Sequence, residues 1–142
     1  MLPRGRTSEA PLIWLLDTNV LIQAVRGRPR SVASRLRATS PDDLAVSSIT
    51  TAELWYGAAK SVDPEQTRVA WSEVLGPYEV LGFDRAAAEL HGQLRYELRH
   101  RPIGERDLLI AAIALASDLT VVTHNVAEFH RVPGLRVEDW AR

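Results

Sequence analysis

The stretch Leu12–Asn19, LIWLLDTN, decides the fold of this chain. Its five apolar residues, 12–16, are typical of a buried strand, and they end abruptly in an acid followed by two small polar residues. In an open α/β sheet, ligands bind just beyond the carboxyl ends of the strands. Asp17 is therefore predicted to bind a metal ion or a phosphate. The alternative is a helix N-cap, a position at which Asp is favoured.

Apolar stretches alternate with helical patterns along the rest of the chain, an order that is typical of βαβ units around a mostly parallel sheet. Further strands are expected at 44–47, 78–81, 120–123 and near 135–137. Helices are expected at 19–25, 31–39, 50–60, 64–75, 84–100 and 108–119, the second of them capped by Ser31. The predicted fold class is α/β, a three-layer α/β/α sandwich. Residues 1–11 are expected to be a loose N-terminal extension, and residues 12–142 a single domain.

The composition excludes several classes of protein. A chain of 142 residues with 46% hydrophobic and 25% charged residues fits one ordinary globular domain. The absence of cysteine excludes disulfides, thiolate zinc sites and a cysteine nucleophile. No apolar run approaches the ~18 residues that a transmembrane helix needs, and the start of the chain is a poor signal peptide. A cytoplasmic protein with no membrane partner is expected.

The charge is balanced overall but uneven along the chain. A net charge of −1 argues against a surface coated for nucleic-acid binding. Five arginines nevertheless fall within residues 26–37, with no acid among them: Arg26, Arg28, Arg30, Arg35 and Arg37. Such a cluster suits a phosphate backbone, and the alternative is a solvated helix face.

Two more carboxylates are expected at the same edge of the sheet as Asp17, because right-handed crossovers bring the carboxyl ends of parallel strands to one edge. Glu53 follows the second strand, and its alternative role is the capping box Thr50-x-x-Glu53. Asp107 opens an apolar helix whose start is expected to be buried, where an unpaired carboxylate is costly. Its alternative role is a favourable place in the helix dipole. Three acids at one edge predict a divalent cation site.

Other polar residues near this edge are weaker candidates. Ser48 can bond a carboxylate or a phosphate, and Asn125 follows a later strand. His124 is expected to be an exposed loop residue, and Glu105 is a reserve acid. The four histidines lack zinc-ligand spacing, and the sequence has no Gly-rich phosphate loop and no serine elbow.

Four motifs in order resemble the PIN-domain ribonucleases, and within them the VapC toxins of type II toxin–antitoxin systems. They are Leu16–Ile22 (LDTNVLI), Thr51–Gly57 (TAELWYG), Ile103–Ala112 (IGERDLLIAA) and Val122–Phe129 (VTHNVAEF). The ending Val132–Trp140 (VPGLRVEDW) is also similar to that subgroup. The resemblance covers residues 12–140.

The resemblance implies a fold, a reaction and partners. It implies that Asp17, Glu53 and Asp107 bind Mg²⁺, with Mn²⁺ as the alternative, and that Asn125 joins them as a catalytic residue. Many relatives carry a fourth acid in the 123–125 region, and Asn125, being neutral, is expected to act through a water. The implied activity is a metal-dependent endoribonuclease toxin whose products carry a 5′ phosphate and a 3′ hydroxyl. The implied partners are RNA, a second copy of the chain and a VapB-type antitoxin.

Two further interpretations remain open on the sequence. The first is a housekeeping nuclease that processes RNA or DNA, and the second is a non-catalytic or receiver-like module that clusters acids around Mg²⁺. In the nuclease interpretations, a set of polar residues is expected to position the substrate: Thr18, Asn19, Ser48, Thr123, Arg26, Arg28 and Arg30.

Overall fold

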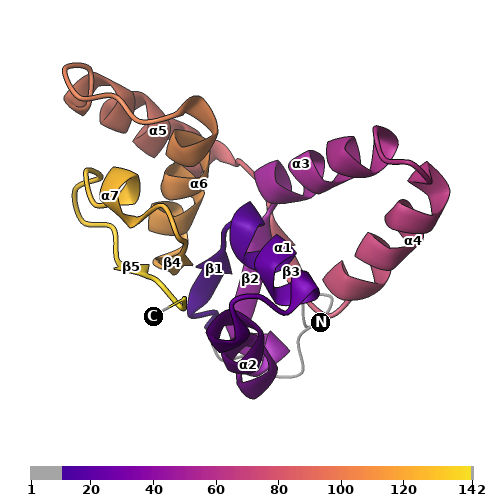
Figure 1. The fold of residues 1–142 in the computed structure, drawn as a ribbon. Coiled ribbons are helices and arrows are strands. Elements are labelled where there is room, and N and C mark those ends of the chain that lie inside the picture. The colour runs from indigo at the N-terminus through magenta and orange to yellow at the C-terminus, as the bar shows by residue number, and fades with distance from the viewer. Residues whose placement is uncertain (1–10, 142) are drawn as a thin grey trace.

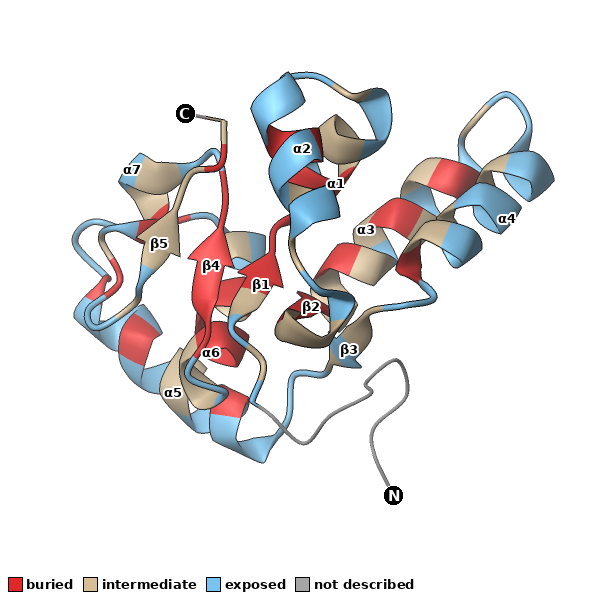
Figure 2. Cartoon of the chain, turned by 90° about the horizontal axis from the view of Figure 1, so that it is seen from below, coloured by how far each residue is buried: buried red, intermediate tan, exposed pale blue. Residues whose placement is uncertain are grey.

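A five-stranded parallel sheet forms the centre of the molecule. The computed structural model describes residues 11–141. The strands are β1 (Trp14–Leu16), β2 (Leu44–Ser47), β3 (Glu79–Leu81), β4 (Thr120–Val122) and β5 (Val137–Glu138). Their order across the sheet is β3-β2-β1-β4-β5, and every pair is parallel. The strand that precedes Asp17 is therefore central, with β2 and β4 on either side of it (Figure 2).

The sheet is buried on both faces. The register places Leu15 between Ala45 and Val121, and these three side chains belong to the apolar core on one face. The next residue of each strand points to the other face and joins a second core. Because both sets are apolar, the central strands carry uninterrupted hydrophobic runs, as expected where helices cover both sides of a parallel sheet.

Helices form the two outer layers. They are α1 (Thr18–Arg26), α2 (Arg30–Ala38), α3 (Ser48–Ala59), α4 (Pro64–Leu75), α5 (Arg85–Glu97), α6 (Glu105–Ala116) and α7 (Val126–Phe129). Helices α1 and α2 cover one face and α5 and α6 the other (Figure 2). Helices α3 and α4 form a hairpin that projects away from the sheet (Figure 1). The predicted three-layer sandwich is confirmed.

Several predicted boundaries were wrong in detail. The second helix begins at Arg30 after Pro29 and has no side-chain cap, so Ser31 does not cap it. The short helix α7 was not predicted at all, because four residues carry too little periodicity to be recognised. The predicted extension over 1–11 lies, except for Pro11, outside the described residues, so the division of the chain into extension and domain stays a prediction. No helix within residues 11–141 is long and apolar enough to cross a membrane.

The C-terminal segment packs back onto the first strand. The Trp140 ring is buried and meets the Trp14 ring edge to face, with 5.7 Å between ring centroids. The Arg35 guanidinium lies 4.9 Å from the Trp140 ring centroid and donates to Glu138 at 3.1 Å. At least this member of the arginine cluster is therefore used within the fold.

Candidate metal centre

The three predicted acids line one cavity beyond the carboxyl end of β1. The cavity has a volume of about 520 Å³. Its lining residues are Asp17, Thr18, Asn19, Glu53, Gly104, Glu105, Arg106, Asp107 and Asn125. These residues come from α1, α3, the start of α6 and the segment after β4. The topology thus brings together side chains that are far apart in the sequence.

Asp17 has a fixed orientation at the base of this cavity. One carboxylate oxygen accepts from the Thr18 backbone amide at 2.8 Å, so the predicted alternative of a helix N-cap is also realised. The other oxygen accepts from the Thr123 hydroxyl at 2.8 Å. Asp17 is only 6% exposed. Burial raises the pKa of this carboxyl, the two hydrogen bonds lower it, and the nearby charge of Glu53 raises it further.

Glu53 faces the cavity and does not cap its own helix. Ser47 is the N-cap of α3 and accepts from the Thr50 amide, so the predicted capping box is wrong. One Glu53 oxygen accepts from the Thr18 hydroxyl at 2.8 Å, and the other accepts from the Arg106 guanidinium at 2.7 Å. The capping alternative failed because Ser47, directly at the end of β2, caps the helix one turn earlier.

Asp107 belongs to a small cluster of polar groups at the other side of the cavity. Its Oδ2 atom accepts from the Asn125 side-chain amide at 3.0 Å, and the same amide donates to Glu128. Partial burial raises the pKa of the Asp107 carboxyl to about 7, and hydrogen bonding and charge repulsion from Glu128 add to the effect. The Asn125 and Gly104 donors hold the pKa of Glu128 below its ordinary value.

Glu128 is a member of this site that the sequence interpretation missed. It lies on α7, three residues after Asn125, and also accepts from the Gly104 amide at 2.8 Å. Residues three apart share one side of a helix. The spacing Asn-x-x-Glu after an apolar strand was the available signal, because it is typical of a helix start. It was overlooked because no helix was expected there.

The donor set fits a hard divalent cation. Mg²⁺ and Mn²⁺ prefer carboxylate and other oxygen ligands, and Asp17, Glu53 and Asp107 supply them. Burial raises the pKa of both aspartates, and neighbouring carboxylates raise it further, so a bound cation would favour their charged forms. Within residues 11–141, no group of three acidic or histidine side chains lies close enough together to hold one metal ion. Arg106 supplies the positive charge that Glu53 faces in this conformation.

The remaining predicted residues lie in three places. Thr123 is completely buried, and its hydroxyl donates to Asp17. Arg26 lines a neighbouring groove. Three others are not among the residues that line either the cavity or the groove: Ser48, Arg28 and Arg30.

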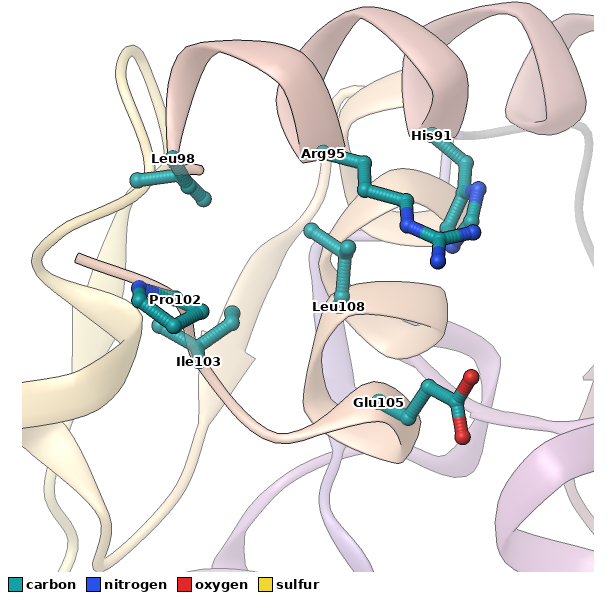
Figure 3. A pocket seen from close by; sticks show the side chains of 7 residues that line it. All are labelled: His91, Arg95, Leu98, Pro102, Ile103, Glu105 and Leu108. Atoms are coloured by element: carbon teal, nitrogen blue, oxygen red, sulfur yellow. The ribbon is translucent and has the colours of Figure 1, made fainter. Parts of the chain in front are cut away.

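A second, smaller cavity lies between α5 and α6 and is shown in Figure 3. Its volume is about 110 Å³, well below the roughly 300 Å³ at which ligand pockets usually begin. Four apolar side chains line it, with His91, Arg95 and Glu105 completing the wall. It contains a single carboxylate and no counterpart of the acid cluster, so the larger cavity is the candidate site.

Comparison with known proteins finds a matching family model and curated relatives over most of the chain. The PIN domain family model matches residues 14–135. The chain is 40% identical over 131 residues to the tRNA(fMet)-specific endonuclease VapC of Salmonella typhimurium, a match that covers 91% of this chain and 98% of the relative. It is 38% identical over 132 residues to ribonuclease VapC2 of Rickettsia felis, covering 91% and 98%.

Solved structures of VapBC complexes are also similar to this chain. The crystal structure of DNA-bound VapBC from Salmonella typhimurium superposes with a TM-score of 0.84 at 40% identity, covering 91% of this chain and 98% of that one. VapBC2 from Rickettsia felis, bound to a DNA fragment from its promoter, gives a TM-score of 0.82 at 37% identity, covering 91% and 99%. The similarity extends over nearly the full length of each chain.

Proposed function

This chain belongs to the PIN-domain family, and we propose that it is a VapC-type ribonuclease, the toxin of a toxin–antitoxin pair. The observation that carries this proposal is the single cavity lined by Asp17, Glu53 and Asp107. PIN-domain ribonucleases are metal dependent, and we propose Mg²⁺ as the ion here, with Mn²⁺ as the alternative. The family assignment favours a nuclease over a non-catalytic acid cluster.

The residues of the cavity have separable roles in phosphodiester hydrolysis. Asp17, Glu53 and Asp107 would hold the ion, which when bound supplies Lewis-acid activation of the scissile phosphate and of water. Thr123 and the Thr18 amide fix the Asp17 carboxylate, so its oxygens are presented in one orientation. The Thr18 hydroxyl likewise orients Glu53.

The cluster of Asp107, Asn125 and Glu128 is placed to take up the proton that the attacking water loses. The Asn125 side-chain amide donates to the carboxylates of both Asp107 and Glu128. A proton accepted by either acid therefore stays within one hydrogen-bonded group. Because Asp107 would also hold the ion, its pKa of about 7 describes the metal-free protein, and Glu128 is the acid of this group that remains to accept the proton. In this proposal Asn125 positions the two acids and does not itself bind the ion.

The proposed substrate is a structured RNA, with initiator tRNA as the first candidate. Its support is the tRNA(fMet)-specific activity in the names of relatives that are 40% and 41% identical over almost their whole length. A VapB-type antitoxin is the proposed protein partner, because solved relatives are VapBC complexes. A homodimer is proposed from the same resemblance. With RNA as substrate, the proposed location is the cytoplasm.

Incubation of the purified chain with initiator tRNA tests this function. We expect site-specific cleavage with Mg²⁺, no cleavage in EDTA, and product ends, mapped by sequencing, that carry a 5′ phosphate and a 3′ hydroxyl. Asp17→Asn should abolish cleavage. Asp84→Asn is the matched control, because Asp84 also caps a helix, α5, but is not among the residues that line the cavity.

Two results would contradict the proposal. Cleavage of RNA at the wild-type rate by Asp17→Asn would exclude this cavity as the active site. Cleavage that persists in EDTA would exclude a metal-dependent mechanism. Cleavage of other RNAs with initiator tRNA left intact would keep the nuclease and reject the proposed substrate.

A further inference from the structure

A long groove opens directly from the acid cavity and runs between α1 and the α3–α4 hairpin. Its volume is about 680 Å³. It shares four lining residues with the acid cavity: Thr18, Asn19, Glu53 and Arg106. We infer that this groove receives the single-stranded RNA that flanks the scissile phosphate, with Tyr56 as the platform on which a base stacks. This inference rests on the proposed ribonuclease function and extends it to the path of the substrate.

The lining of the groove has the two chemistries that a single strand requires. Apolar side chains, among them Val25 and Trp71, provide surface for bases. Cationic side chains, Arg26, Lys60 and Arg106, provide charge for phosphates. Glu53 is the single acid among the lining residues, and it is already paired with Arg106. Positive grooves that carry aromatic side chains are typical of single-strand binding without base-specific contacts.

Tyr56 is the aromatic residue most available to a ligand in this groove. It is 67% exposed, so most of its ring is open to solvent. The Lys60 ammonium lies 4.7 Å from the ring centroid, a weak exposed contact that a stacked base can replace. An exposed ring beside an exposed cation is a suitable stacking platform for an unpaired base.

The position of Tyr56 connects this platform to the acids. Glu53 and Tyr56 lie on α3, and Lys60 is the residue that caps its C-terminus. Their spacings of three and four residues place them on one side of the helix. Seven residues of helix span about 10 Å. A strand that follows this side of α3 therefore passes from Lys60, over Tyr56, to the carboxylate that would hold the ion.

A tyrosine on the opposite part of the molecule provides a matched control. Tyr96 on α5 is 66% exposed, and the Arg99 guanidinium lies 3.9 Å from its ring centroid. It therefore has the same exposure and the same type of cationic neighbour as Tyr56. It is not among the residues that line the groove or the acid cavity. Any general effect of losing an exposed aromatic ring will appear equally at both positions.

The experiment measures binding separately from cleavage. A fluorescein-labelled single-stranded RNA of mixed sequence is titrated with the full chain in EDTA, and fluorescence anisotropy gives Kd. We expect Tyr56→Ala to weaken binding about tenfold, the usual effect of losing one stacked base, and Tyr56→Phe to bind like the wild type. Tyr96→Ala should leave Kd unchanged. RNA that contains 5-bromouridine should, after irradiation, cross-link to the α3 peptide that contains Tyr56.

The outcomes distinguish this inference from the function on which it rests. If the wild-type chain cuts RNA but Tyr56→Ala binds and cuts equally well, the inference fails and the ribonuclease stands. If the wild-type chain does not cut RNA in Mg²⁺, the proposed function itself fails. Equal losses for Tyr56→Ala and Tyr96→Ala would also reject the groove.

Two other possible occupants of the groove, an antitoxin segment and a second copy of the chain, would each give a different experimental result. A loss of antitoxin binding by Tyr56→Ala, with RNA binding unchanged, would assign the groove to a protein segment and overturn the inference. A change of oligomeric state in Tyr56→Ala, measured by light scattering, would assign the ring to a contact between subunits and overturn it as well.

Discussion

The Arg106 guanidinium donates to the Glu53 carboxylate across 2.7 Å at the point where the acid cavity meets the groove. The arginine side chain is 70% exposed, whereas the glutamate is 25% exposed. An ion pair with one partner in solvent contributes little to stability. Arg106 can therefore leave Glu53 at small cost, and the same guanidinium can contact a phosphate of the substrate.

Arg106→Gln is predicted to affect the metal and the RNA in opposite directions. Removing the guanidinium frees Glu53, so we expect Mg²⁺ to bind more tightly by no more than about fivefold, the limit set by an exposed ion pair. RNA binding in EDTA should weaken and depend less on salt, because one phosphate contact is lost. Calorimetry with Mg²⁺ and anisotropy with labelled RNA measure the two effects. Arg101→Gln, at an exposed position that lines neither the groove nor the acid cavity, is the control and should change neither.

The stability of the metal-free protein is predicted to fall as the pH rises. The pKa of Asp107 is raised from its ordinary value of 3.8 to about 7 in the folded state. Between those values the folded chain holds more protons than the unfolded chain, so the free energy of unfolding decreases as pH increases. Asp17 acts in the same direction and Glu128 in the opposite one. Thermal unfolding in EDTA from about pH 5 to about pH 8 measures the slope.

Asp107→Asn should flatten this dependence, and Asp84→Asn should leave it unchanged. Added Mg²⁺ should raise Tm more at the higher pH, because the ligands must be deprotonated to bind it. A wild-type Tm that rises steadily over this range in EDTA would contradict the assignment.

Thr123→Val is predicted to destabilise the protein and to reduce cleavage. The Thr123 hydroxyl is buried, donates to Asp17 and accepts from the backbone N–H of Asn125. Valine preserves the shape of the side chain but removes the hydroxyl, so both partners lose a hydrogen bond. The expected cost is about 1–3 kcal/mol in the free energy of unfolding. Urea denaturation measures the stability, and initiator tRNA cleavage measures the activity.

Thr120→Val is the control for this prediction. Thr120 begins β4, the strand that Thr123 directly follows, and its hydroxyl accepts a long hydrogen bond of 3.3 Å from Arg136. We expect little loss of stability and normal cleavage. Equal effects at the two positions would show that Thr123 does not act through Asp17.

Asn125→Asp is predicted to make the protein more dependent on metal. The Asn125 amide donates to both Asp107 and Glu128, and an aspartate there replaces a donor with a third negative charge. In EDTA, Tm should fall, whereas the increase in Tm on adding Mg²⁺ should exceed that of the wild type. Asn125→Ala separates the two causes, since it loses the donor without adding charge. If Asn125→Asp matches Asn125→Ala under both conditions, charge is not the determinant.

The sequence predicted the sheet and the acids well, because both depend on local patterns. The apolar run 12–16 and the acid that follows it are visible without any tertiary information, and so is the apolar start of α6. The role of Glu53 was ambiguous because Thr50-x-x-Glu53 satisfies a local rule. In the structure Ser47 caps α3 instead, and the hydroxyl of Thr18, on another helix, donates to Glu53.

Contacts between segments that are distant in the chain could not be predicted from the sequence. The Arg106–Glu53 pair joins α6 to α3, and Glu128 reaches Gly104 across the cavity. Neither contact follows from periodicity or spacing, since each depends on how the layers pack. The arginine cluster shows the same limit: Arg35 packs on Trp140, whereas Arg26 lines the groove.

The strand order of the sheet has a consequence for synthesis of the protein. Strand β4 lies beside β1 even though about a hundred positions separate them, and it brings Thr123 to Asp17. A polypeptide that has been synthesised only as far as β3 lacks this neighbour. The acid cavity is therefore complete only after β4 and the residues that follow it have been made, and a fragment that ends before β4 lacks both Thr123 and Asn125.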